Sequence, residues 1–189
     1  MKHILKTVFN FLLFPIFLIG LLLPKSKNIW IFGSWFGDYY IDNSKYLFEY
    51  VDNNENAITP IWLTRNKLVL QYLRNEGKRC YYIKSFLGFY YTARSSVVIV
   101  SQGLVDINKL GVSNQIKVLL WHGSPIKKIA YDDRKNANPY NQLFFKVILK
   151  TWNIFFPFER ENWDIITASS KEVKNKFISA FKSTKQRVR

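Results

Sequence analysis

The sequence predicts an α/β fold, namely a Rossmann-like parallel sheet with helices on both faces, preceded by an apolar helix. Three observations support this fold class. After residue 28, short apolar runs alternate with segments of helical periodicity, which indicates βαβ units. The run Val118, Leu119 and Leu120 is continuously apolar, as expected of a parallel strand that is buried on both faces. An uncharged apolar stretch, residues 7–23, comes before this pattern.

Composition limits the classes of protein to consider. The chain has 189 residues, of which 48% are hydrophobic, so it can bury one well-packed domain. Its 28 lysine and arginine residues against 13 aspartate and glutamate residues give a formal net charge of +15. This surplus favours a phosphate-bearing partner, which could be nucleic acid, anionic lipid, a phosphorylated polymer or a nucleotide. The lysines are scattered and no recognition motif is visible, so we do not expect nucleic acid to bind.

The only cysteine, Cys80, excludes an internal disulfide and suits a reducing compartment. We expect it to be a buried structural thiol. A single cysteine also leaves no metal cluster of the cysteine type, and the sequence gives no reason to expect a cofactor.

Residues 1–27 are an apolar segment with lysines on both flanks. Residues 7–23 would form a helix of about 25 Å, which is short for a hydrocarbon core of about 30 Å. A cleaved signal peptide would need small residues after the apolar run, and residues 24–27 offer none. Three alternatives stay open: a spanning helix, a helix that dips into the cytoplasmic leaflet with its lysines on anionic headgroups, and a buried core helix. We expect association with the cytoplasmic face of the cell membrane, with His3 at headgroup level and without chemistry.

The rest of the chain predicts alternating strands and helices, assigned from the period of the apolar residues. The expected strands are residues 28–34, 58–64, 79–83, 95–102, 115–122 and 163–169. The expected helices are residues 42–51, 67–77, 85–94, 138–152 and 169–181.

Local signals fix several helix ends. Asp42 or Ser44 is positioned to cap the helix over 42–51, and Gly77 stops the helix over 67–77. Ser169 and Glu172 form a capping box for the last helix. The apolar face of the 42–51 helix carries Tyr46, Leu47, Tyr50 and Val51, and one side of the last helix carries Val173, Phe177, Ile178 and Phe181.

His122 lies at the end of the strand expected over 115–122, in the stretch WHGSPIKK. In an open parallel sheet, ligands bind at the carboxyl ends of strands, so this histidine lies where a site is expected. Gly123 can adopt a backbone conformation that is closed to other residues, and Pro125 stiffens the turn.

Lys127 and Lys128 place two positive charges next to this histidine. They favour a phosphate-bearing ligand and a neutral imidazole that can act as a base. From the residues alone, two purely structural interpretations stay open. His122 could simply hydrogen-bond a neighbouring loop, and the lysines could be a solvated surface.

Residues 121–132, WHGSPIKKIAYD, resemble the WHG-[TS]-P-x-K-K segment of the CDP-glycerol glycerophosphotransferases, bacterial enzymes that build teichoic acid and related polyol-phosphate polymers. Residues 29–51 resemble the first strand and the D-N-S-K-x-L-x-E-Y helix of this family, and residues 164–181 resemble its strand and helix further downstream. The three matches occur in the expected order and cover the chain from about Asn28 to Phe181.

The resemblance implies a GT-B architecture of two Rossmann-like domains with the active site between them. It also implies transfer of glycerol phosphate from CDP-glycerol to a hydroxyl of a lipid-linked acceptor at the membrane, with release of CMP. His122 corresponds to the WHG histidine of the family and would be the general base. Gly123, Ser124, Lys127 and Lys128 are the expected substrate-binding residues, the lysines from local chemistry more than from the family. CDP-ribitol enzymes share the segment, so the donor polyol stays open.

The sequence departs from the family pattern after Phe181. The donor site of the family, with a second histidine and a D-Y-S-S-type turn, belongs to a C-terminal domain, and the two histidines of this chain leave no candidate for the second one. We therefore expect residues 28–182 to be the acceptor-side domain, residues 183–189 a basic tail, and the chain a fragment that is incomplete without a donor domain. The alternative is a non-catalytic membrane-bound module that binds a polyanionic polymer or a partner enzyme.

Overall fold

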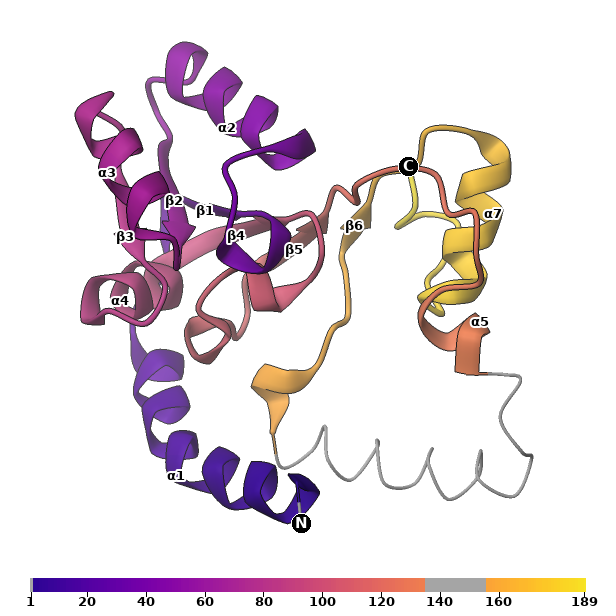
Figure 1. Ribbon diagram of the computed structural model, residues 1–189, viewed down its shortest axis with the longest axis horizontal. Helices are drawn as coiled ribbons and strands as arrows, with labels where there is room; N and C mark the ends of the chain where they lie inside the picture. The colour runs from indigo at the N-terminus through magenta and orange to yellow at the C-terminus, as the bar shows by residue number, and fades with distance from the viewer. Residues whose placement is uncertain (1, 135–155) are drawn as a thin grey trace.

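A parallel sheet forms the centre of the computed structural model, which describes residues 2–134 and 156–189 (Figure 1). Within these residues the sheet has six strands in the order β3-β2-β1-β4-β5-β6. This is a doubly wound order, in which the chain reverses its direction of growth across the sheet between β1 and β4. The predicted α/β class with a Rossmann-like parallel sheet is confirmed.

The elements follow the predicted order with shifted boundaries, and the helix expected over 138–152 lies outside the described residues. The strands are β1 (Ser26–Gly33), β2 (Thr59–Thr64), β3 (Cys80–Tyr82), β4 (Ser95–Val100), β5 (Ile116–Leu119) and β6 (Ile165–Ile166). The α-helices are α1 (Lys2–Leu22), α2 (Asp42–Asn54), α3 (Lys67–Asn75), α4 (Phe86–Arg94), α5 (Ala130–Arg134) and α7 (Lys171–Ala180). Short 3-10 turns are η1 (Trp35–Gly37), η2 (Leu104–Asp106), η3 (Lys109–Gly111) and η4 (Pro157–Glu159).

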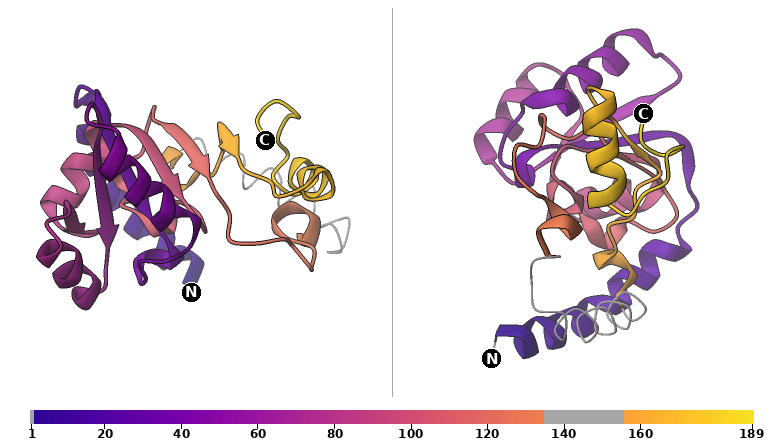
Figure 2. Two further views of the ribbon diagram at one scale, coloured as in Figure 1. Left: turned by 90° about the horizontal axis from the view of Figure 1, so that it is seen from above. Right: turned by 90° about the vertical axis from the view of Figure 1, so that its right-hand side faces the viewer.

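Both faces of the sheet are covered, because successive residues of the central strands point to opposite sides (Figure 2). In β1, Ile31 belongs to the apolar core on one face and Phe32 to the core on the other. Phe48 of α2 and Leu73 of α3 complete the core around Phe32, and Tyr91 of α4 packs against the core that contains Ile31. Phe177 of α7 extends this second core beyond β6 (Figure 1). This double burial is the reason why the strands read as continuous apolar runs.

The last two strands are shorter than predicted. β5 ends at Leu119, although the amide of Leu120 still donates to the carbonyl of Val100 at 2.9 Å. Trp121 then leaves the extended conformation, with φ of 56°. His122 is therefore three residues beyond the end of β5. The last residues of the chain lie against β6, where Val188 is buried and pairs with Ile166.

The predicted cap of α2 is wrong, and its predicted apolar face is confirmed for Leu47 and Val51 but wrong for the two tyrosines. Asp42 has φ of 72°, and its carboxylate accepts from the amide of Asn43 and from the indole of Trp35 instead of capping the helix. Ser44 is buried, and the residue before the helix makes no side-chain cap. Tyr46 and Tyr50 are exposed, whereas Phe48 and Val51 are buried. The tyrosines were counted as apolar, but Phe48, which has no hydroxyl, takes the core position.

The cap of α7 is also one residue further on than predicted. Ser170, not Ser169, caps the helix, and its hydroxyl accepts from the amide of Val173 at 3.2 Å. The predicted apolar side is confirmed, since Val173 and Phe177 are buried and Ile178 and Phe181 pack against them. Gly77 ends α3 as predicted, with φ of 71°.

Helix α1 leads directly into β1 and lies below the sheet in Figure 1. Its Phe17 packs with Phe156 and Phe158 in a small core of its own. Lys25, expected on headgroups, instead donates to the carbonyl of Ala93 and to Ser113 Oγ, and burial lowers its pKa. Among the residues described with their side chains, we find no helix that is long and apolar enough to cross a membrane.

Candidate active site

The carboxyl ends of β1, β4 and β5 lie side by side, because β4 pairs with both neighbours. Three loops follow these ends: η1 after β1, η2 after β4, and residues 121–123 after β5. The sheet reverses between β1 and β4, and ligands bind outside the strand ends at this point of a doubly wound sheet. The site predicted around His122 therefore lies beside the position that the topology favours.

His122 is half-buried between two indoles. Its ring lies 4.4 Å from the ring of Trp121, centroid to centroid, at an interplanar angle of 26°. Trp35 of η1 lies 5.5 Å away at 52°. Trp121 in turn packs edge-on against Phe177 and Phe181 at the end of α7. The imidazole is thus held by aromatic contacts from two loops and keeps part of its surface open to a ligand.

The backbone before His122 is strained. Trp121 has φ of 56°, a left-handed conformation that costs a non-glycine residue about 1–2 kcal/mol. Two side chains bond to the carbonyls at this bend: Asn43 Nδ2 donates to the Trp121 oxygen at 3.0 Å, and Thr167 Oγ1 donates to the Leu120 oxygen at 2.7 Å. The bend is therefore held from α2 on one side and from the end of β6 on the other.

Loop η1 carries the other indole and is strained as well. Trp35 and Phe36 have φ of 45° and 58°. The buried carboxylate of Asp106 holds this loop to the end of β4, because it accepts from the amide of Phe36 at 2.6 Å and from that of Ser101 at 3.0 Å. Burial raises the pKa of Asp106, and its bonds to backbone amides act in the opposite direction. The Trp35 indole donates to Asp42 Oδ2 at 3.0 Å, so both its backbone and its ring are fixed.

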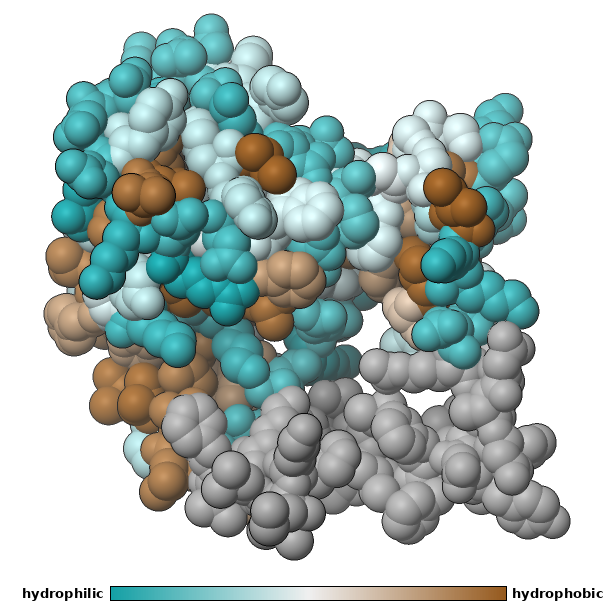
Figure 3. Space-filling view, in the orientation of Figure 1, coloured by the Kyte–Doolittle hydropathy of each residue, from teal (hydrophilic) through white to brown (hydrophobic). Residues whose placement is uncertain are grey.

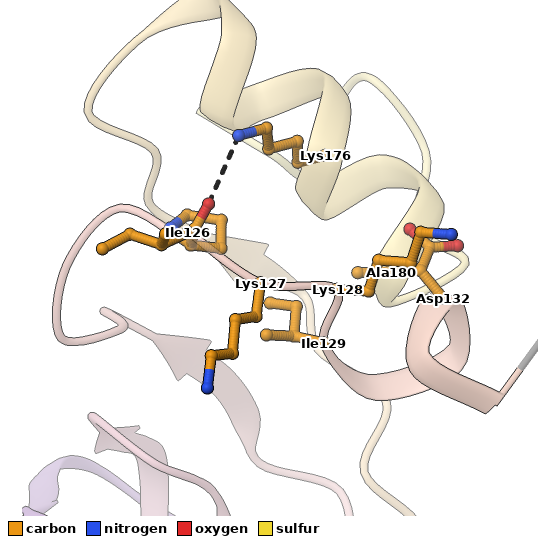
Figure 4. A pocket seen from close by; sticks show the side chains of 8 residues that line it. Ile126, Lys127, Lys128, Ile129, Asp132, Lys176 and Ala180 are labelled. Carbon is orange, nitrogen blue, oxygen red and sulfur yellow. Dashed lines mark hydrogen bonds between the residues drawn. The ribbon is translucent and has the colours of Figure 1, made fainter.

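Lys127 and Lys128 line a small cavity of about 160 Å³ between the loop after β5 and α7 (Figure 4). Lys176 of α7 also lines it, and its ammonium donates to the carbonyl of Pro125 at 3.3 Å. Figure 4 shows the Lys127 ammonium pointing away from that of Lys176. The ammonium groups of Lys127 and Lys176 therefore do not converge on one point, and His122 is not part of the cavity lining.

Gly123 and Ser124 lie between the histidine and the lysines. Gly123 has φ of 144°, a conformation that other residues rarely adopt. Apart from Gly123 and its two chain neighbours, no heavy atom lies within 4 Å of the place where a side chain would begin, so a ligand can approach the backbone here. Ser124 Oγ lies 3.2 Å from Ser169 Oγ at the start of α7. Over the described ranges, no three histidine, cysteine, aspartate or glutamate side chains are grouped in a way that could hold a metal ion.

The sequence model of one family, described as CDP-Glycerol:Poly(glycerophosphate) glycerophosphotransferase, matches residues 16–189. The chain belongs to this family. The match includes both strained indole loops, one of which carries His122, and α7. No protein of curated function matches the sequence.

Solved structures of the wall teichoic acid polymerase TagF have a similar fold. One matches with a TM-score of 0.61 and 20% identity, covering 99% of this chain and 45% of the TagF chain. A variant soaked with CDPG matches with a TM-score of 0.62 and 20% identity, covering 100% and 46%. A second variant matches with a TM-score of 0.62 and 22% identity, covering 100% of this chain and 45% of the TagF chain. This chain thus spans less than half the length of these TagF chains.

The sequence identified the loop of this candidate site but not the residues around it. His122 lies at the carboxyl edge, as predicted from the strand and turn pattern, and the roles assigned to Gly123, Ser124, Lys127 and Lys128 stay predictions. Trp35, Asn43 and Asp106 were missed. Trp35 and Asn43 lie within the stretch that resembles the family, which was a usable signal. Asp106 gave no usable signal in the sequence, because its partners are backbone amides, which every residue type except proline provides.

Proposed function

We propose that this chain is the acceptor-side part of an enzyme that transfers glycerol phosphate from CDP-glycerol to a hydroxyl of a membrane lipid-linked acceptor in teichoic acid or related polymer synthesis. The observation that carries the proposal is a partly exposed histidine, clamped by two indoles at the carboxyl edge of the sheet, within a chain that belongs to the glycerophosphotransferase family.

His122 is the general base of the proposed reaction. The acceptor oxygen attacks the β-phosphorus of CDP-glycerol while its proton passes to the imidazole, and the bond from that phosphorus to the oxygen of CMP breaks. A positioned base of this kind contributes about 10²- to 10⁴-fold to the rate. Charge develops on the phosphoryl oxygens, and the proposal assigns its neutralisation to Lys127 and Lys128, with Gly123 and Ser124 lining the approach.

The donor site is assigned to a second Rossmann-like domain that would complete a GT-B architecture. The coverage of the TagF chains, 45–46%, supports this part of the proposal. Binding of CDP-glycerol and full catalysis are therefore properties of the completed enzyme, which would act at the cytoplasmic face of the membrane.

Transfer of labelled glycerol tests the proposal directly. Membranes that contain the lipid-linked acceptor are incubated with labelled CDP-glycerol and the chain, with and without a separately produced donor domain of the family. We expect label in the polymer with wild type and at least about 100-fold less with His122→Ala, because the base is gone. His3→Ala, which removes the other histidine of the chain, is the matched control and keeps the activity.

The second candidate is a module that binds a polyanionic polymer without chemistry, which the surplus of positive charge favours. Wild type that retains acceptor polymer but transfers no label, even with the donor domain present, would decide for this module.

A further inference from the structure

The bend at Trp121 needs an outside constraint, because its left-handed backbone is unfavourable for a non-glycine residue. The bend also aims the imidazole, since the carbonyl of Trp121 belongs to the peptide that joins it to His122. Any side chain that fixes this carbonyl also fixes the orientation of the backbone at His122.

Asn43 contacts this carbonyl from the first turn of α2, and the two residues are 78 positions apart. Its Nδ2 donates to the Trp121 oxygen at 3.0 Å and, over a longer 3.5 Å, to the Leu120 oxygen. Helix capping would use the side-chain oxygen as an acceptor, whereas Asn43 uses its amide nitrogen as a donor. The side chain thus serves the loop after β5 and not its own helix.

We propose that Asn43 is a positioning residue that holds the peptide between Trp121 and His122 and keeps the imidazole against the indoles. The preceding residue acts on the second indole, because Asp42 Oδ2 accepts from Trp35 Nε1 at 3.0 Å. The start of α2 therefore fixes both aromatic rings that contact His122, one through a side chain and one through a backbone carbonyl. Asn43 itself is exposed, so its replacement leaves the core intact.

A nuclear magnetic resonance measurement tests the positioning on the chain itself. Protons of an imidazole stacked on an indole resonate upfield of their position in an unfolded chain. Only His3 and His122 contribute histidine signals, and His122→Gln assigns them. We expect Asn43→Asp, which has the same size but no amide donor, to move the His122 signal toward the unfolded position, and Asn43→Ala to do the same.

Asn54→Asp is the matched control. Asn54 is exposed on the same helix, and its Nδ2 donates to the carbonyl of Tyr50 at 2.8 Å within that helix. This variant should leave the His122 signal in place. Circular dichroism during heating establishes that all three variants fold. A folded Asn43→Asp protein with an unmoved His122 signal overturns the proposal, even where its melting temperature has fallen.

The catalytic consequence rests on the proposed function and is measured separately. In the transfer assay, Asn43→Asp should lower kcat by about 10- to 100-fold with little change in KM, because the base is misplaced while binding contacts remain. If wild type transfers nothing, the proposed function fails, and the histidine signal still decides the positioning. If wild type is active and Asn43→Asp is equally active, the proposed function stands, and the inference that Asn43 positions His122 for catalysis fails.

Discussion

Cys80 begins β3 and points into the core formed by Phe32, Phe48 and Trp62. Burial raises the pKa of its thiol to about 12, and the nearby Arg74 lowers it only in part. The reactive form of cysteine is the thiolate, so both burial and the raised pKa suppress its chemistry. The prediction of a structural thiol from the lone cysteine is confirmed in its burial.

This burial makes Cys80 a reporter of unfolding. We expect a thiol reagent at pH 8 to leave the native chain unlabelled over the time in which it labels the urea-unfolded chain completely. As urea increases, labelling should follow the loss of helical circular dichroism, because the sheet must open to expose the sulfur. Fast labelling of the native protein would contradict the packing of β3.

At the scale of elements, α2 shows how one helix serves both stability and the site. Phe48 is fully buried, with ring centroids 5.3 Å from Phe32 and 5.5 Å from Trp62. The same helix presents Asp42 and Asn43 to the indole loops. Core packing of the helix therefore sets the position of the residues at its first turn.

Two substitutions distinguish the observed face of α2 from the predicted one. Phe48→Ala should lower the free energy of unfolding by about 3–5 kcal/mol, because it removes a buried ring and leaves a cavity. Tyr46→Ala, at a position that is 68% exposed, should change it by less than about 0.5 kcal/mol. Urea titrations of both variants measure the difference, and a loss for Tyr46→Ala as large as that for Phe48→Ala would contradict the observed face.

The parts predicted from sequence are those with local signals. The order of strands and helices followed from apolar periodicity, and the loop of His122 followed from a strand end with Gly123 behind it. The face of α2 was right for Leu47 and Val51 but took two exposed tyrosines in place of Phe48, because tyrosine and phenylalanine weigh alike in a periodicity argument. The contacts of Trp35, Asn43 and Asp106 were missed because each joins segments far apart in the chain, and only the order of strands in the sheet brings them together.

At the scale of the whole molecule, two surface properties stand out: helix α1 exposes apolar side chains, and the chain has a large positive charge. In Figure 3 hydrophobic side chains gather at the lower left, over α1. The described exposed large apolar residues of this helix are Phe11, Leu12, Ile16, Leu18, Ile19, Leu21 and Leu22. Such a surface, combined with a net charge of +15, supports the proposed attachment to anionic membranes.

Vesicle flotation tests this attachment. We expect the chain to float with phosphatidylglycerol vesicles and less with phosphatidylcholine vesicles. Leu12→Glu combined with Ile19→Glu should lower the bound fraction by about tenfold or more, since each loses the burial of a large apolar side chain. Leu68→Glu is the control, because Leu68 is 76% exposed on α3 and away from α1. Equal binding of the double variant and the control would exclude α1 as the contact.

The two side-chain hydrogen bonds that hold the bend before His122 also have a consequence for the time course of folding. Asn43 and Trp121 are 78 positions apart, and Thr167 lies 47 positions beyond Leu120. Contacts between such distant segments close a large loop of chain and form slowly compared with helices and hairpins. We expect the imidazole to remain disordered until β5 and β6 have joined the sheet, so that a partly folded chain has much of its secondary structure but no organised histidine.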